Sequence, residues 1–177
     1  MKDFFSNGSD KKRVVALSIV ILGALFGIGV YSYVSVTVPR YPLSSKDSVS
    51  SWNFQSAYPA GSEDEKRIKS EIEHLQSILG KGTSDYEVYV GIASEYELLG
   101  EGKRSYLYLS KAIEISPNKA LAYFSMGHLL ERVGALYSAK QAYNTAVQKE
   151  PSNTLYTAYR DQFMAKYAEQ AKAVQAK

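Results

Sequence analysis

Residues 86–117 read YEVYVGIASEYELLGEGKRSYLYLSKAIEISP, and residues 120–151 read ALAYFSMGHLLERVGALYSAKQAYNTAVQKEP. Aligned on Pro117 and Pro151, the two stretches match at a spacing of 34 residues. Large apolar side chains align with large ones, small with small, and glycine with glycine. The matched pairs are Tyr89 and Tyr123, Ile92 and Met126, Ala93 and Gly127, Tyr96 and Leu130, Gly100 and Gly134, Ser105 and Ala139, Leu109 and Tyr143, and Ala112 and Ala146. Two unrelated amphipathic hairpins, the alternative, would have to produce these eight matches by chance.

Each stretch has the pattern of two helices joined by a short turn. Counting from Tyr89, apolar or small residues recur at i, i+3, i+4 and i+7, which is one face of a helix. A second such face begins at Ser105. Gly100 and Gly134 stand where a left-handed residue can end a helix. The closing prolines cannot continue a helix interior, so each ends one unit and begins the next.

This pattern resembles the tetratricopeptide repeat (TPR), in which aromatic, Leu, Gly, Tyr, Gly, Ala, Phe, Ala and Pro positions recur at the same period. The resemblance places repeats at 86–119 and 120–153. It implies an all-α fold of helical hairpins stacked into a short solenoid. It also implies a protein that binds other proteins rather than one that carries out chemistry.

Two repeats are few for such a solenoid, since about three units are normally needed. Upstream, Ser62 and Glu65 have the spacing of a capping box. They precede an amphipathic stretch, so we expect a leading helix at 62–80. Ser84 and Glu87 have the same spacing at the start of the first repeat.

A second single helix is expected at 154–172, followed by a tail at 173–177. Arg160 and Asp161 stand where a third repeat would have Leu and Gly, so this segment is interpreted as a capping helix. Its expected apolar face is formed by Leu155, Tyr159, Phe163 and Tyr167. The helical domain is thus predicted to cover residues 62–172.

The N-terminal part predicts a membrane helix. Residues 14–38 contain no charged side chain, and a bilayer core needs about 20 such residues. We expect a retained signal-anchor rather than a cleaved signal peptide or a buried soluble helix, because the apolar run is long and no small-residue cleavage site follows it. Gly23 and Gly27 form a small-xxx-small pair, which allows close packing on a second copy or on another membrane protein, or simply faces lipid.

Charged flanks predict the orientation of this helix. Residues 1–13 carry four basic side chains, which favours a cytoplasmic N-terminus and repeats on the extracytoplasmic face. A bacterial inner-membrane protein with a periplasmic repeat domain fits best. An organellar anchor with cytosolic repeats is the alternative.

Between the two parts, residues 39–61 contain three prolines and many serines, so a flexible linker is predicted. Trp52 and Phe54 stand out within it. Trp52 is interpreted as an interfacial anchor or as a plug on the adjacent helix, and a recognition motif for a partner is the alternative.

Several function classes are disfavoured. The first forty residues carry the whole net charge of +3, and residues 41–177 hold sixteen charges of each sign, so a nucleic-acid-binding patch is not expected. The chain has no cysteine, and its two histidines, His74 and His128, have no partner at metal-ligand spacing. No phosphate-binding or nucleophile motif occurs. We therefore expect no enzyme, no metal and no cofactor.

In the TPR family, the first helices of successive hairpins line a groove through defined helix positions. Carried over to this chain, the resemblance implies a protein-binding groove formed by Glu87, Val90, Ser94, Glu97, Leu98, Leu121, Phe124, His128, Glu131 and Arg132. Coverage of Phe124 by the helix at 154–172 would make this groove shallow.

Two functions remain from the sequence. The first is a membrane-anchored module or scaffold that binds a protein or peptide partner through its TPR groove. The second is a structural accessory subunit of a larger membrane complex, held mainly by its transmembrane helix.

Overall fold

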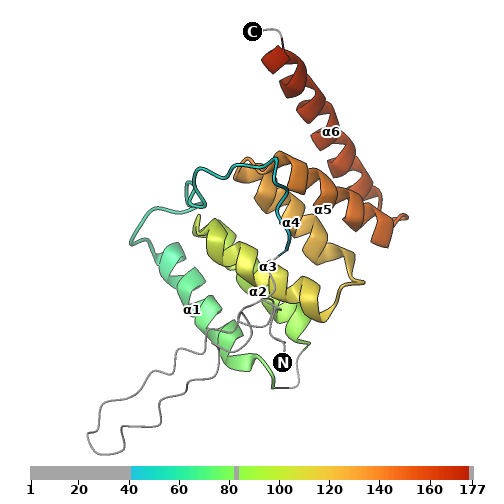
Figure 1. The fold of residues 1–177 in the computed structure, drawn as a ribbon. Helices are drawn as coiled ribbons and strands as arrows, with labels where there is room; N and C mark the ends of the chain where they lie inside the picture. Colours follow the sequence, from blue (N-terminus) through green and yellow to red (C-terminus); the bar gives the residue numbers. More distant parts are fainter. Residues whose placement is uncertain (1–40, 82–83, 176–177) are drawn as a thin grey trace, which may run out of the picture. The chain divides into compact units, whose positions relative to one another are not determined.

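The computed structural model describes residues 41–81 and 84–175, with side chains up to residue 168. These residues lie in the second of two units of the chain, residues 37–177. The described part contains six α-helices and no β-strand, which confirms the all-α prediction (Figure 1). The helices are α1 (Glu63–Ile78), α2 (Asp85–Leu98), α3 (Gly102–Ile115), α4 (Ala120–Arg132), α5 (Leu136–Lys149) and α6 (Thr154–Gln175). The predicted membrane helix at 14–38, with Gly23 and Gly27, lies outside the described residues.

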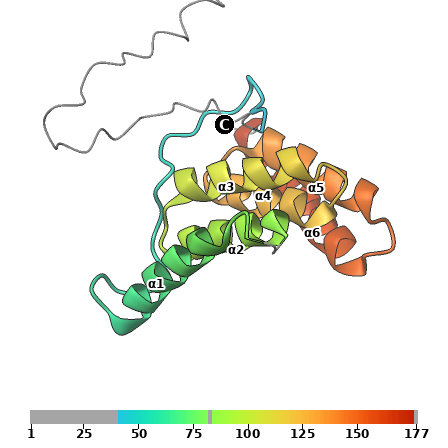
Figure 2. The same ribbon diagram turned by 90° about the horizontal axis from the view of Figure 1, so that it is seen from below.

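The two 34-residue stretches form two helical hairpins, α2 with α3 and α4 with α5, which lie side by side (Figures 1 and 2). Both turns have the same geometry. Gly100 has a φ of 74° and Gly134 a φ of 80°, so each occupies the left-handed region predicted for it. The residue after each glycine donates its N–H to a carbonyl near the end of the preceding helix. These bonds run from Glu101 to Tyr96 at 2.9 Å and from Ala135 to Leu130 at 2.8 Å.

The hairpins differ in the sizes of the residues that pack between their two helices. In the second hairpin a Cβ added to Gly127 would lie 2.7 Å from Cδ1 of Tyr143, so the missing side chain makes room for the aromatic ring. The first hairpin has Ala93 and Leu109 at the equivalent positions, and both are buried. Relative to the first hairpin, the second therefore has a smaller residue on its first helix, Gly127, and a larger one on its second helix, Tyr143.

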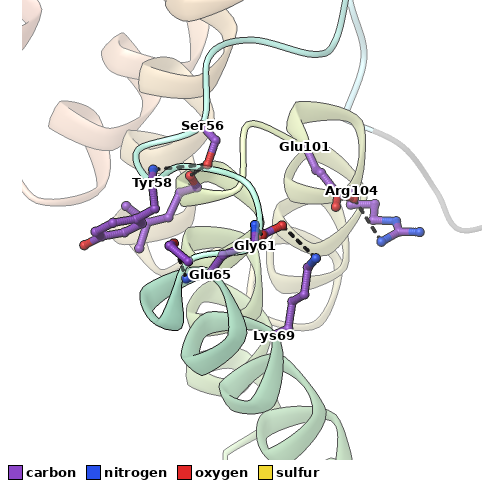
Figure 3. Close-up of polar contacts among 9 residues, drawn as sticks. Ser56, Tyr58, Gly61, Glu65, Lys69, Glu101 and Arg104 are labelled. Carbon is purple, nitrogen blue, oxygen red and sulfur yellow. Dashed lines mark hydrogen bonds and ion pairs between the residues drawn. The ribbon is translucent and has the colours of Figure 1, made fainter.

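Helix α1 covers most of the range predicted for the leading helix and packs Ile68 and Ile72 against α2. Its N-cap is Ser62, whose Oγ accepts a hydrogen bond from the Glu65 amide at 3.2 Å. In a capping box the Glu65 carboxylate would accept from the Ser62 amide. Here it accepts from the amide of Gly61, one residue earlier (Figure 3). Lys69 pairs with the same carboxylate at 2.7 Å.

The second predicted capping box is only partly present. Ser84 is the N-cap residue of α2, but its side chain makes no hydrogen bond to the helix amides. The Ser84 side chain contributes instead, after Lys119, to lowering the pKa of Glu87. The predicted position of the N-cap is therefore confirmed, whereas the predicted hydrogen bond from the helix amides to the Ser84 side chain is wrong.

Helix α6 begins as expected, with the Asn153 side chain accepting hydrogen bonds from the first amides of the helix. It continues to Gln175, into the predicted tail. Its predicted apolar face is only partly correct. Tyr156 and Phe163 are buried, whereas Leu155 and Tyr159 are among the most exposed large apolar side chains of the described part. Helix α6 thus packs on α5 with one face and leaves a second apolar face open.

Residues 41–58 form an irregular segment, called the strap below, that is bound along the hairpins. The Tyr41 amide donates to Ser110 Oγ at 3.0 Å, and the Phe54 amide donates to the Gly100 carbonyl at 3.1 Å. Trp52 packs on the Tyr106 ring of α3, with 4.9 Å between ring centroids. The strap therefore contacts α3 as well as the turn before it.

The strap also caps α5 from 90 residues away. The two carboxylate oxygens of Asp47 accept from the amides of Tyr137 and Ser138, each at 2.9 Å. These amides belong to the first turn of α5, whose own N-cap residue, Ala135, provides no side-chain bond. The Ser44 amide adds a hydrogen bond of 2.8 Å to Ser138 Oγ.

This docking differs from the flexible linker predicted for residues 39–61. Prolines and serines predict free chain, but side chains at alternate positions from Trp52 to Tyr58 turn toward the helices. Trp52 packs on helix α3, which agrees with one of the two structural interpretations of this residue, the plug on a helix. No helix within residues 41–81 and 84–175 has the length and apolar character needed to cross a bilayer.

Candidate binding cavity on α2, α4 and α6

A cavity of about 380 Å³ opens on the side of the molecule formed by α2, α4 and α6. Seven of the ten residues predicted for the groove line it, so the structure brings most of that set together. These seven are Val90, Ser94, Glu97, Leu98, Phe124, His128 and Arg132. The remaining lining residues are Ala93, Ser105, Leu109, Ser125, Leu155 and Tyr159.

The other three predicted residues lie outside this cavity. Glu87 pairs with Lys119 at 2.5 Å, and this hydrogen bond is the main reason why the pKa of Glu87 falls to about 2. Leu121 is exposed on the first turn of α4. Glu131 lines an adjoining hollow of about 430 Å³ and pairs with Lys166 of α6 at 2.8 Å.

Three charged side chains meet at one end of the cavity. The Glu97 carboxylate of α2 contacts His128 Nδ1 at 2.9 Å and Arg132 Nη1 at 3.1 Å, both from α4. Both contacts involve the same oxygen, Oε1. Glu97 is the least exposed of the three side chains, so the two hairpins are joined by a partly buried ion pair.

This arrangement shifts the pKa values of Glu97 and His128 in opposite directions. Burial on its own would raise the pKa of Glu97, but the hydrogen bonds and charges of His128 and Arg132 outweigh it, and the pKa is lowered. The hydrogen bond to Glu97 raises the pKa of His128, against the opposing effects of burial and of Arg132. The charged forms of both groups are therefore stabilised.

The strap reaches this charged end. The Arg132 guanidinium lies over the Phe54 ring, with Cζ 3.9 Å from the ring centroid. Arg132 is thus held by a carboxylate from α2 and by an aromatic ring from the strap. The strap thereby helps to position a residue of the cavity.

Aromatic side chains form the opposite wall. Phe124 of α4 stacks on Tyr156 with 4.7 Å between centroids and meets Tyr159 edge-on at 5.3 Å. Helix α6 therefore covers part of Phe124, as the sequence had allowed. It does not close the cavity, because Leu155 and Tyr159 extend the apolar wall.

Sequence reasoning missed the contributions of α6 because that helix was interpreted only as a cap. Leu155 and Tyr159 lie 34 residues after Leu121 and Ser125. Gln162 and Lys166, which line the adjoining hollow, lie 34 residues after His128 and Arg132. Continuing the repeat register through Arg160 and Asp161 would have found these positions.

The part of the chain that the structure describes contains no group of three or more His, Asp or Glu side chains placed to hold a metal ion. No protein-family model matches this sequence, and no curated protein is significantly similar to it. The cavity thus combines apolar walls with a carboxylate at one end that is paired with His128 and Arg132.

Proposed function

We propose that this protein is a single-pass, membrane-anchored interaction module of the TPR kind, which binds a protein or peptide partner at the cavity on α2, α4 and α6. The 34-residue period, the matching turns of the two hairpins and the position of the cavity on the first helices support this proposal. The membrane anchor at 14–38 and the extracytoplasmic side are proposed from the sequence.

One observation carries the proposal: apolar side chains are exposed around the cavity. Of the six large hydrophobic side chains that are strongly exposed in residues 41–81 and 84–168, three belong to α4 and α6 on this side. They are Leu121 at 42%, Leu155 at 54% and Tyr159 at 41% exposure. Exposed apolar groups that gather beside a concave site are typical of surfaces that bind another molecule.

Site-specific photocrosslinking in native membranes tests the site. A photoreactive side chain at Leu155 should yield a defined crosslinked product, and one at Gln141, an exposed position on α5, should not. Adding Leu121→Ala and Phe124→Ala should weaken the product at Leu155 without loss of helix content. Equal crosslinking at Leu155 and Gln141 would contradict the proposed site.

Single cysteines test the anchor, because the natural chain has none. A cysteine at Asn7 and one at Gln141 should react with a membrane-impermeant maleimide from opposite sides of the membrane. Release of the protein by alkaline carbonate would show that residues 14–38 do not anchor it.

The alternative function, a structural accessory subunit, is favoured by the strap. Only Pro39 and Arg40 lie between the proposed span and Tyr41, where the strap begins, so little chain remains as a tether. Constitutive co-purification with one complex, lost in a Gly23→Leu, Gly27→Leu variant, would support this function over the first.

A further inference from the structure

The charges of the described residues are unevenly distributed over the fold. The strap, α3 and α5 carry six basic and two acidic side chains, whereas α1 and α2 carry three basic and nine acidic ones. Each basic side chain of α1 pairs with an acidic residue of the same helix. In contrast, five lysines of the strap, α3 and α5 make no ion pair with a described residue: Lys46, Lys103, Lys111, Lys140 and Lys149. These elements therefore carry an excess of positive charge that the fold itself does not neutralise.

Two exposed apolar side chains lie where the strap meets the first turn of α5. Leu43 of the strap is 40% exposed, and Tyr137 of α5 is 41% exposed. The residues that follow them are joined by the hydrogen bond from the Ser44 amide to Ser138 Oγ, at 2.8 Å. Nζ of Lys46 lies over the Tyr137 ring, 5.1 Å from its centroid. Apolar, aromatic and cationic groups thus meet at one place on the surface.

The acidic residue next to Lys46 does not neutralise this place. Both carboxylate oxygens of Asp47 accept hydrogen bonds from α5 amides, each at 2.9 Å. Lys140 adds a second cation, because it follows Tyr137 by about one helical turn and shares its face of α5. The strap–α5 patch is defined by these four side chains: Leu43, Lys46, Tyr137 and Lys140.

The patch lies close along the chain to the proposed membrane span. The span ends at Val38, and the Tyr41 amide is bound to Ser110 Oγ of α3 at 3.0 Å. Three residues of fully extended chain reach at most about 11 Å. Leu43, the first residue of the patch, follows Tyr41 by two positions. A bilayer that holds the span is therefore within reach of the patch.

Lipid headgroups match the chemistry of these residues. Anionic headgroups attract lysines that lie near a membrane surface and have no acidic partner. Tyrosine favours the boundary between headgroups and acyl chains, and the aliphatic part of a lysine can lie there while its ammonium group contacts phosphate. None of the four residues lines the cavity or the adjoining hollow, so a partner and a lipid surface can be bound at the same time.

We propose that the strap–α5 patch binds the anionic lipid surface of the bilayer, with Leu43 and Tyr137 at the level of the headgroups and Lys46 and Lys140 on lipid phosphates. This inference rests on the membrane anchor of the proposed function and adds a second contact with the membrane. The helical domain then lies on the lipid surface instead of moving freely at the end of the span.

The full chain in lipid nanodiscs tests this inference. A fluorescent label on a cysteine at Asn144, exposed about one turn beyond Lys140, reports on the patch, and a label at Ser70, exposed on α1, is the matched control. The nanodiscs contain phosphatidylcholine alone or an equal mixture with phosphatidylglycerol, and a nitroxide quencher on a fraction of the headgroups. Quenching should be strong only at Asn144 in the anionic nanodiscs and should decrease with added salt. Equal quenching at the two positions, or in the two kinds of nanodisc, would overturn the proposal.

Two charge-reversal variants locate the contact. Lys46→Glu with Lys140→Glu should lower the ratio of docked to undocked protein at least about tenfold, because each lysine near an anionic surface favours binding about fivefold. Lys66→Glu with Lys81→Glu, at exposed positions on and just after α1, changes the net charge equally and should have no effect. Circular dichroism should show the same helix content in both. Quenching at Asn144 that survives the first pair, or is lost equally with the second, would overturn the proposal.

A protein partner is the alternative occupant of the strap–α5 patch. A photoreactive side chain at Tyr137 should crosslink to lipid in native membranes. A defined crosslinked protein at this position would assign the patch to a protein partner and overturn the proposal.

These results can be separated from those for the proposed function. Crosslinking at Leu155 without quenching at Asn144 would remove this inference and leave the interaction function in place. Release of the protein by alkaline carbonate, together with quenching at Asn144 in anionic nanodiscs only, would contradict the anchor and retain the patch as a peripheral lipid site.

Discussion

The two hairpins of this protein share a sequence pattern but differ in what surrounds them. At the first turn, the strap lies directly on Gly100, and a Cβ added to this glycine would overlap the Phe54 carbonyl oxygen. At the second turn, a Cβ added to Gly134 would meet nothing within 4 Å. Gly134 is therefore needed only for its left-handed backbone. Gly100 is needed for its left-handed backbone and also for the space that the strap occupies.

The strap also contacts the second helix of the two hairpins in different ways. In the first hairpin it crosses the start of α3 so closely that a Cβ at Gly102 would lie 2.5 Å from the Trp52 carbonyl oxygen. In the second hairpin the equivalent residue is Leu136, and the strap caps the helix through Asp47. Equal positions in a repeat thus acquire different roles once a third segment packs on them.

The largest expected difference between the hairpins is at their turns. Gly100→Ala combines a left-handed backbone with an overlap against the strap and should lower the free energy of unfolding by about 2–4 kcal/mol. Gly134→Ala meets only the backbone cost, about 1–2 kcal/mol. Urea unfolding followed by circular dichroism measures both. Equal losses for the two variants would mean that the strap does not rest on the first turn.

Substitutions at the paired small and large residues inside the hairpins should have the next largest effect on the free energy of unfolding. Gly127→Ala forces a Cβ against the Tyr143 ring and should cost about 1–3 kcal/mol by overpacking. Combining it with Tyr143→Leu recreates the pair Ala93 and Leu109 of the first hairpin. The double variant should lose less stability than the sum of the single variants, and strict additivity would contradict the proposed complementarity.

Loss of the cap on α5 should have a smaller effect. Asp47→Ala removes two hydrogen bonds to the first turn of α5 and should cost about 1 kcal/mol, the usual value for an N-cap. Ser48→Ala, on an exposed neighbour, serves as the matched control. Amide hydrogen exchange should accelerate at Tyr137 and Ser138 in the first variant only. Unchanged protection of these amides would show that the cap is not maintained in solution.

The ion pair between the hairpins should give the smallest effect, and one that depends on pH. The pKa of His128 is raised above 6.5, so its contribution to stability is complete below that pH and is lost as the pH rises through the folded-state pKa. The pKa of Glu97 is lowered below 4.5, so its contribution is present above that pH and is lost as the pH falls through the folded-state pKa. The pair is therefore most stabilising between these two values.

A His128→Gln variant tests this dependence. The difference in unfolding free energy between wild type and variant should be largest between pH 4.5 and 6.5 and should shrink toward alkaline pH. The remaining charged neighbours, Arg132 and Glu131, are the same in both proteins. A difference that grows with pH would contradict the assigned direction of the His128 shift.

Most of the helical fold could be predicted because its signals are local. The apolar periodicity of α2 to α5, the glycines at 100 and 134 and the prolines that follow each hairpin all act within a few residues of chain. The single helices α1 and α6 were found for the same reason. Arg160 and Asp161 interrupt the repeat pattern, so the sequence predicts only a cap at α6 and not its contribution to the cavity.

The strap and the interior of the cavity could not be predicted in this way. Asp47 carries no local sign that it will cap a helix 90 residues later, and Tyr137 carries none that Lys46 will lie over its ring. Both depend on contacts between segments far apart in the chain, whose cost in chain entropy is repaid only when the helices have already packed. Helix periodicity thus specified the hairpins, whereas their packing with one another, with α6 and with the strap produced the cap, the strap–α5 patch and the cavity.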